Sequence, residues 1–97
     1  MNYYILFYTL TENYLQERGQ YRAEHLGLAK DAAEKGELVL GGALDNPADE
    51  AVLIFRGADE SVAINFAKED PYVKNGLIKE WKVRKWNAVV GSKFENE

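Results

Sequence analysis

The chain contains one histidine, His25, and its position in the sequence makes it the first candidate for chemistry. At about 100° per helical residue, His25 and Arg22 fall on the apolar side of a predicted helix, the side formed by Leu26, Ala29 and Ala33. A cation and an imidazole are unexpected there, because burying a charge without a partner is unfavourable. We therefore expect a pocket in which the imidazole takes or gives a proton near neutral pH. The alternative, a half-buried histidine that is hydrogen-bonded to the backbone, stays open.

Asp70 is the second candidate, at the expected end of another helix. It continues the apolar face of Val62 and Phe66, so its carboxylate is expected to point inward, where it would orient an imidazole. The dipole of a helix repels a carboxylate at the C-terminus, and the position of Asp70 therefore needs a separate structural reason. The alternative is that Asp70 and Pro71 simply start a turn.

Gly41 and Gly42 are adjacent in an expected strand and are candidates for substrate binding, because a backbone without side chains can pass close to a ligand. A bulge in the strand explains the pair equally well. Most aromatic side chains are expected in the core or at an interface rather than in a platform that stacks bases: Tyr4, Tyr8, Tyr21, Tyr72, Trp81 and Trp86.

The composition argues against several classes of function. The chain has 97 residues, a formal net charge of −4 and no cysteine. An acidic chain without a basic face is unsuited to nucleic acid or to an anionic membrane surface, and thiol nucleophiles and zinc–thiolate sites cannot form. With one histidine and no glycine-rich phosphate motif, we expect neither a metal nor a cofactor. The length predicts one domain over residues 1–97, and the lack of a signal-peptide pattern and of cysteine predicts a cytoplasmic location.

The first half of the chain is predicted to form a strand, a helix and a second strand. Residues 3–10 are apolar or aromatic on both alternating faces, which predicts a strand that is covered on both sides. A helical pattern follows up to Gly36, its expected C-cap, and Gly19 sets residues 13–18 apart as a separate turn. Residues 38–44 are the second predicted strand.

The second half is predicted to repeat this alternation in a different order. Residues 52–55 are predicted to form a third strand. A helix follows, with Asp59 as its expected N-cap. It should end near Asp70, because Pro71 disfavours helical geometry in the residue before it. Residues 72–76 are expected to be a turn-like link.

The last predicted strand covers residues 78–90. Its apolar residues change their alternation before Trp86, which predicts a β-bulge near Arg84 or Lys85. The charged tail from Ser92 onward is expected to fray.

This order, βαββαβ, predicts an α+β fold of the ferredoxin-like type, a four-stranded antiparallel sheet with both helices on one face. The other face is then left bare, although the first strand is apolar on both sides. An exposed apolar sheet face is best explained by a partner. We therefore expect a homodimer that packs sheet to sheet about a two-fold axis.

Taken together, these residues resemble the YCII-related family, a branch of the dimeric α+β barrel superfamily. The matching features are, in order, the apolar first strand, Arg22 before His25 and Leu26, Gly36 before Leu38, Gly41 and Gly42, and Asp70-Pro71-Tyr72 before Gly76. The resemblance covers nearly the whole chain. It implies a sheet-to-sheet dimer and a pocket with a His–Asp pair, here His25 and Asp70, accompanied by Arg22. One branch of the family removes chloride from a chlorinated hydroxyhydroquinone.

The resulting hypothesis is a small-molecule enzyme without a cofactor, in which His25 moves a proton during elimination or isomerisation of a cyclic or phenolic compound. Asp70 would fix the tautomer of the imidazole, and Arg22 would hold an anionic group of the substrate. Two alternatives stay open. One is a non-catalytic module that binds a small ligand in the same pocket, and the other is a structural dimer in which the pocket has no function.

Overall fold

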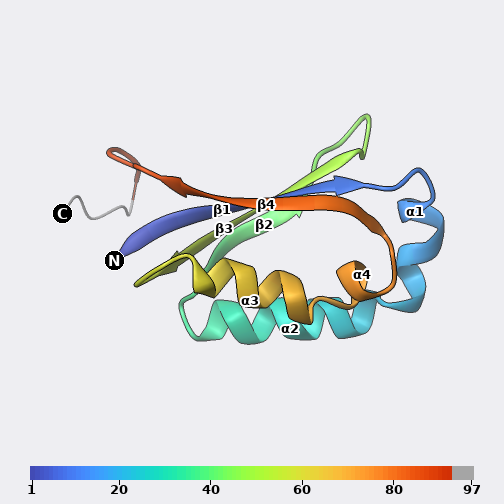
Figure 1. Ribbon diagram of the computed structural model, residues 1–97, viewed down its shortest axis with the longest axis horizontal. Coiled ribbons are helices and arrows are strands. Elements are labelled where there is room, and N and C mark those ends of the chain that lie inside the picture. Colours follow the sequence, from blue (N-terminus) through green and yellow to red (C-terminus); the bar gives the residue numbers. More distant parts are fainter. Residues whose placement is uncertain (93–97) are drawn as a thin grey trace.

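The computed structural model describes residues 1–92, which form a four-stranded antiparallel sheet with helices on one face (Figure 1). The strands are β1 (Asn2–Leu10), β2 (Leu38–Ala43), β3 (Glu50–Gly57) and β4 (Ile78–Trp86). The helical segments are α1 (Tyr14–Glu17), the 3-10 turn η1 (Arg18–Gln20), α2 (Arg22–Glu34), α3 (Ser61–Glu69) and α4 (Pro71–Lys74). This order confirms the predicted ferredoxin-like βαββαβ fold.

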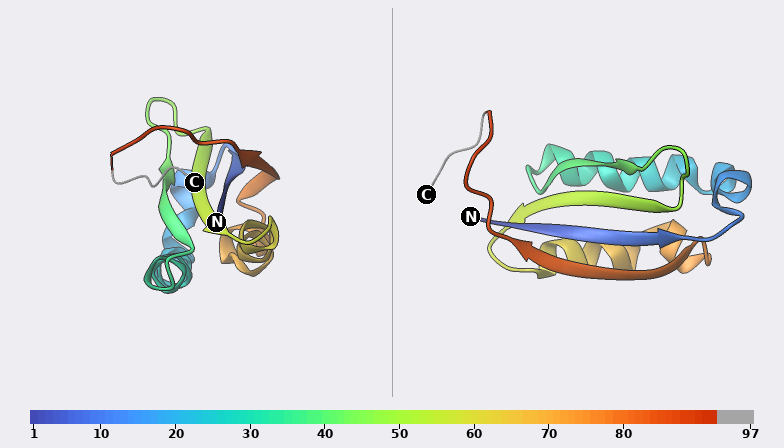
Figure 2. Two further views of the ribbon diagram at one scale, coloured as in Figure 1. Left: turned by 90° about the vertical axis from the view of Figure 1, so that its left-hand side faces the viewer. Right: turned by 90° about the horizontal axis from the view of Figure 1, so that it is seen from above.

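The sheet has the strand order β2-β3-β1-β4, and every neighbouring pair is antiparallel. The end-on view shows α2 and α3 on the same side of the sheet (Figure 2). The short segments α1, η1 and α4 gather at the end of the sheet where β1 finishes and β4 begins (Figure 1). This end therefore brings together segments that lie far apart in the sequence.

The hydrophobic core lies between the sheet and the helices. From β1 it receives one alternating set, whose members are at most 6% exposed: Tyr4, Leu6, Tyr8 and Leu10. Phe55 of β3 and Phe66 of α3 pack against each other there, with ring centroids 5.2 Å apart. Burial of apolar surface on this scale is the main force that holds the helices on the sheet.

The face of the sheet turned away from the helices, called the outer face below, is also rich in apolar residues. The registers of the three strand pairs put seven of them on that face: Tyr3, Ile5 and Phe7 of β1, Leu40 of β2, Val52 and Ile54 of β3, and Trp86 of β4. Leu40 is 68% exposed and Trp86 is 46% exposed. The same registers also place charged residues on this face, among them Lys82 beside Phe7 and Arg84 beside Ile5. The prediction that both faces of the first strand are apolar therefore leads to an apolar patch with charged neighbours, which no helix within residues 1–92 covers.

The predicted breaks in the first helical region are confirmed. The region divides into α1, η1 and α2, and Gly19 lies inside η1. Gly36 has a φ of 77° and its N–H donates to the carbonyl of Ala33, so it ends α2 in a left-handed conformation that favours glycine.

Two predictions for the C-terminal half are wrong. Residues 72–76 are not a simple link, because Pro71 opens the one-turn helix α4, a position that suits its fixed φ. The last strand ends at Trp86, and its register with β1 is unbroken from Trp86 to Glu80. The irregularity lies at the other end of the strand, where Lys79 is the extra residue, and not near Arg84 or Lys85.

Trp86 consequently lies on the outer face while Trp81 faces the helices, so no bulge is needed to reconcile the two. Of the tail that was expected to fray from Ser92, residues 93–97 lie outside the described residues. Within residues 1–92, no helix has the length and apolar content needed to cross a membrane.

The apolar side of α2 also differs from the predicted one. Ala32 is buried, and Leu28 and Ala29 pack against the core, whereas Leu26 is 39% exposed and Ala33 is exposed. The core-facing side is therefore turned by about one residue relative to the predicted stripe. The reason is tertiary: α2 lies near the β2 edge of the sheet, so one flank of its apolar side borders a cavity instead of the core.

Candidate active site

The site begins with Asp70, which connects α3 and α4. Its backbone is extended, with φ −66° and ψ 121°, and its Oδ1 accepts a hydrogen bond of 3.0 Å from the N–H of Tyr72. Asp70 thus ends one helix and caps the next, and the amide at the start of α4 favours a carboxylate there. This supplies the structural reason that the sequence left open.

Asp70 is fully buried, with 0% exposure, and both of its oxygens have partners. Oδ2 accepts a hydrogen bond of 2.7 Å from the hydroxyl of Tyr8, and Oδ1 lies 2.9 Å from Nδ1 of His25. A buried carboxylate is tolerated when hydrogen bonds replace its lost hydration. These contacts also fix the orientation of the carboxylate.

His25 lies in the first turns of α2, and the structure brings it into direct contact with Asp70, 45 positions away in the sequence. Its side chain is 16% exposed. If the Asp70 carboxylate is ionised, the proton of the neutral imidazole sits on Nδ1, and the lone pair is on Nε2. Nε2 has no hydrogen-bond partner among residues 1–92, so it is available to a bound molecule.

Two aromatic rings hold the imidazole in place. Tyr72 stacks on it, with centroids 3.9 Å apart and planes 7° from parallel, and Phe66 approaches edge-on at 6.4 Å. Tyr72 also contacts Tyr14 in a T-shaped arrangement at 5.7 Å. Ring packing of this kind limits the rotation of His25 and complements the hydrogen bond to Asp70.

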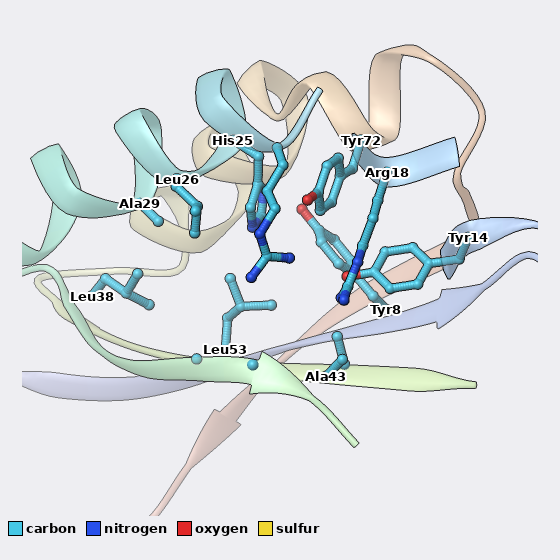
Figure 3. Close-up of a pocket in the computed structure, with 14 residues that line it drawn as sticks. Tyr8, Tyr14, Arg18, His25, Leu26, Ala29, Leu38, Ala43, Leu53 and Tyr72 are labelled. Atoms are coloured by element: carbon cyan, nitrogen blue, oxygen red, sulfur yellow. The ribbon is translucent and has the colours of Figure 1, made fainter. Parts of the chain in front are cut away.

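A cavity of about 210 Å³ opens beside His25, between α2 and the sheet. Arg22, Gly41 and Gly42 line it together with His25, so the predicted binding residues surround the same space, while Asp70 stands behind the imidazole. Figure 3 shows His25 above the cavity, with Leu26, Ala29 and Leu38 on one side and Tyr14 and Arg18 on the other. A space of this size is suited to a compact molecule.

Gly41 and Gly42 pair regularly with β3, and the strand irregularity of β2 lies at Val39 instead. A Cβ atom on Gly41 would lie 3.1 Å from Cγ of Leu53, whereas a Cβ atom on Gly42 would meet no atom within 4 Å. The glycine at position 41 therefore permits the close packing of the cavity wall on Leu53.

Sequence reasoning missed four residues of this site. Tyr8 and Tyr72 were assigned to the core or an interface, and Tyr14 and Arg18 were given no role. All four line the cavity, and the guanidinium carbon of Arg18 lies 5.4 Å from the ring centroid of Tyr14. One signal was present in the sequence: Tyr72 follows Asp70 at the spacing at which a capping carboxylate meets a backbone N–H.

The pKa values of two phenols of the site, Tyr8 and Tyr72, are raised. Burial raises the pKa of Tyr8 far above its ordinary value, and the charge of Asp70 and the hydrogen bond to it act in the same direction. Burial also raises the pKa of Tyr72, and Tyr14 adds to this effect, whereas the Arg22 and Arg18 guanidinium groups oppose it. Both hydroxyls carry their proton at neutral pH, as an ordinary tyrosine does, and can donate hydrogen bonds. Within residues 1–92, no cluster of three or more histidine, aspartate and glutamate side chains could hold a metal ion.

Comparison with known proteins identifies a family for this chain. The YCII-related domain model matches residues 1–87. No curated protein matches the chain.

Solved structures share the fold at low identity. The chain is similar to a 5-chloro-2-hydroxyhydroquinone dehydrochlorinase from Burkholderia phenoliruptrix in complex with 2,5-dihydroxybenzoquinone, with 21% identity, a TM-score of 0.74, and coverage of 98% of this chain and 99% of that chain. It is also similar to a NIPSNAP family protein from Agrobacterium tumefaciens, with 14% identity, a TM-score of 0.58, and coverage of 88% and 90%. An antibiotic biosynthesis monooxygenase matches with 11% identity, a TM-score of 0.58, and coverage of 93% and 100%.

Proposed function

The chain belongs to the YCII-related domain family, and from that premise we propose that it is a small-molecule enzyme in which His25 and Asp70 form an acid–base pair. The observation that carries this proposal is the 2.9 Å contact between Nδ1 of His25 and the fully buried Asp70, with Nε2 unpartnered among residues 1–92 beside a cavity. A base that is held by a fixed carboxylate and lies next to a space for a substrate has the arrangement that general acid–base catalysis requires.

In the proposed reaction, Nε2 of His25 takes a proton from the substrate. Asp70 holds the imidazole in the tautomer that has its lone pair on Nε2, and it stabilises the imidazolium that forms. Arg22 binds an anionic group or the negative charge that develops on an oxygen of the substrate. Gly41 and Gly42 form the opposite wall, close to the substrate.

The reaction class is elimination or isomerisation of a cyclic or phenolic compound, and neither requires a cofactor. In elimination, the electron pair left by the proton forms a new double bond, and a leaving group such as chloride departs with its own pair. In isomerisation, the imidazolium returns the proton to another atom of the same molecule. The dehydrochlorinase with the same fold supports the first of these outcomes for this chain.

The test is turnover of 5-chloro-2-hydroxyhydroquinone, which is measured as the release of chloride. Acid–base catalysis contributes about 10²–10⁴-fold, so His25→Gly should reduce turnover by at least the lower figure. Added imidazole should then restore part of the activity, because the free base can occupy the vacated space.

The control for that experiment is Lys85→Gln, at an exposed position on β4. It should turn over like the wild type. Binding without chloride release in the wild type would favour the non-catalytic module, and full activity of a folded His25→Gly variant would overturn the proposed acid–base pair.

We also propose that two copies pair through the outer face. The support is its apolar patch, from Ile5 and Phe7 in the centre to Leu40 and Trp86 near the two edges, although Lys82 and Arg84 of β4 lie on the same face. Apolar sheet faces that carry no helix layer are normally buried against another surface. A two-fold axis would place the same face of each copy in contact.

A further inference from the structure

The cavity beside His25 has a charge that contrasts with that of the whole protein. The chain carries a formal net charge of −4. None of the residues that line the cavity is acidic, whereas two of them, Arg18 and Arg22, are cationic. A positive recess in an acidic protein attracts anions from solution and repels cations.

Neither guanidinium is neutralised within the chain described. Among residues 1–92, no carboxylate lies within 4.0 Å of Arg18 or Arg22, whereas His25 pairs with Asp70 and Lys74 with Glu69. Arg18 is half-buried and rests against the Tyr14 ring. Arg22 is exposed to solvent where it lines the cavity. An anion bound in the cavity would form charge-assisted hydrogen bonds with such unpaired guanidinium groups.

A second, independent observation points to a missing hydrogen-bond acceptor. Tyr72 is 2% exposed, it lines the same cavity, and its hydroxyl oxygen has no hydrogen-bond partner among residues 1–92. The hydroxyl of a tyrosine is protonated at neutral pH, so it can donate a hydrogen bond to an acceptor. Buried polar groups without a partner are rare in folded proteins. An oxygen of a bound anion would satisfy this donor.

The cavity is polarised from one end to the other. Arg18 and Tyr14 lie at one end, near η1 and α1, and His25 lies between them and an apolar end formed by Leu26, Ala29 and Leu38 (Figure 3). A ligand that matches this distribution has an anionic group and an apolar body, with its reacting atom close to the imidazole. The volume of about 210 Å³ restricts the body to roughly one ring.

We infer that this site selects a single-ring organic anion, a carboxylate or an ionised ring hydroxyl, and that Arg18 determines this specificity together with Arg22 and the Tyr72 hydroxyl. The inference rests on the proposed function for the role of the cavity. It narrows the cyclic substrate to an anion with one ring, and it gives Arg18 a role in specificity. The anionic oxygen lies against the guanidinium groups, and the ring lies against the apolar end.

The test is direct binding to the full chain by calorimetry, without any turnover. The probes are benzoate, its neutral isostere benzamide, and acetate, which has the charge but no ring. We expect benzoate to bind at least 10-fold more tightly than either of the others, since a charge-assisted hydrogen bond is worth about 10- to 100-fold. A fourth probe, 2,4-dinitrophenolate, carries its charge on a ring oxygen, so it distinguishes an ionised ring hydroxyl from a carboxylate.

Variants test which residues determine the affinity for benzoate. Arg18→Gln should weaken benzoate binding by about 10- to 100-fold, and Arg18→Lys should recover part of it. Lys85→Gln removes the same charge from β4, away from the cavity lining, and should leave the affinity unchanged.

The inference is overturned if benzoate does not bind, if benzamide binds equally well, or if Arg18→Gln binds like the wild type. His25→Gly separates this result from the proposed function, because it should lose turnover and still prefer benzoate to benzamide. If the wild type shows no turnover but still prefers benzoate to benzamide, only the proposed function is overturned.

Discussion

The hydroxyl of Tyr8 donates a hydrogen bond of 2.7 Å to Oδ2 of Asp70, a residue 62 positions further along the chain. Tyr8 comes from a central strand and Asp70 from the joint between two helices, so this bond ties the helix layer to the sheet. The same carboxylate holds the imidazole of His25 through its other oxygen. The contact that stabilises the fold and the contact that orients the candidate base therefore share one buried group.

Tyr8→Phe should destabilise the protein, because it leaves a buried carboxylate with one partner fewer. Loss of a hydrogen bond to a charged group costs about 1.5–3 kcal/mol, measurable as a lower midpoint of urea unfolding. The matched control is Tyr4→Phe on the same strand and the same face, where the hydroxyl makes no hydrogen bond within residues 1–92. Equal midpoints for the two variants would contradict the assigned role of Tyr8.

The stability of the wild type should fall at alkaline pH. An unfolded chain releases the phenol proton near pH 10, whereas burial, the charge of Asp70 and the hydrogen bond to it raise the pKa of Tyr8 well above that value in the folded state. The stabilisation is therefore fully present below about pH 10 and declines above it, by at most about 1.4 kcal/mol per pH unit for one tyrosine.

Urea unfolding at a series of pH values between about 8 and 11 measures this slope, and Tyr8→Phe should make it shallower. Tyr72, whose pKa is also raised, should leave a residual slope in that variant. Identical slopes in the two proteins would show that Tyr8 ionises alike in the folded and unfolded states.

Gly41→Ala and Gly42→Ala should differ although the two glycines are neighbours. The new Cβ at position 41 would lie 3.1 Å from Cγ of Leu53, so we expect a loss of stability of about 1 kcal/mol or more. Position 42 has open space, and replacing a strand glycine there should be neutral or stabilising by about 0.5–1 kcal/mol. Thermal unfolding of both variants checks this order, and the reverse order would refute the assigned packing.

Ile54→Glu should abolish self-association if the outer face is the dimer interface, since it buries a charge between the apolar neighbours Ile5 and Leu40. Light scattering over a concentration series should give twice the chain mass of 11.0 kDa for the wild type and the single chain mass for the variant. Lys74→Glu on the exposed surface of α4 serves as the control and should stay dimeric. A monomeric wild type at every concentration would disprove the pairing.

The sequence was sufficient for the element order and the fold class, because alternation in strands, helical periodicity and the signals at Gly36 and Pro71 are local properties. It also singled out His25 and Asp70 as candidates, the first as the only histidine and the second as an acidic residue on an apolar helix face. Local patterns gave the wrong result for features that depend on packing between elements. The bulge of β4 lies at Lys79, and the core-facing side of α2 is turned toward Leu28 and Ala32.

Only the tertiary structure decided which residues meet. His25 and Asp70 approach to 2.9 Å because α2 and the joint between α3 and α4 reach the same end of the sheet. The same packing adds Tyr8, Tyr72 and Arg18 to the site, and no spacing along the chain relates those three positions to His25. The residue types thus set what chemistry is available, while the distances that make it usable depend on how helices sit on a sheet, which is a property of the whole core.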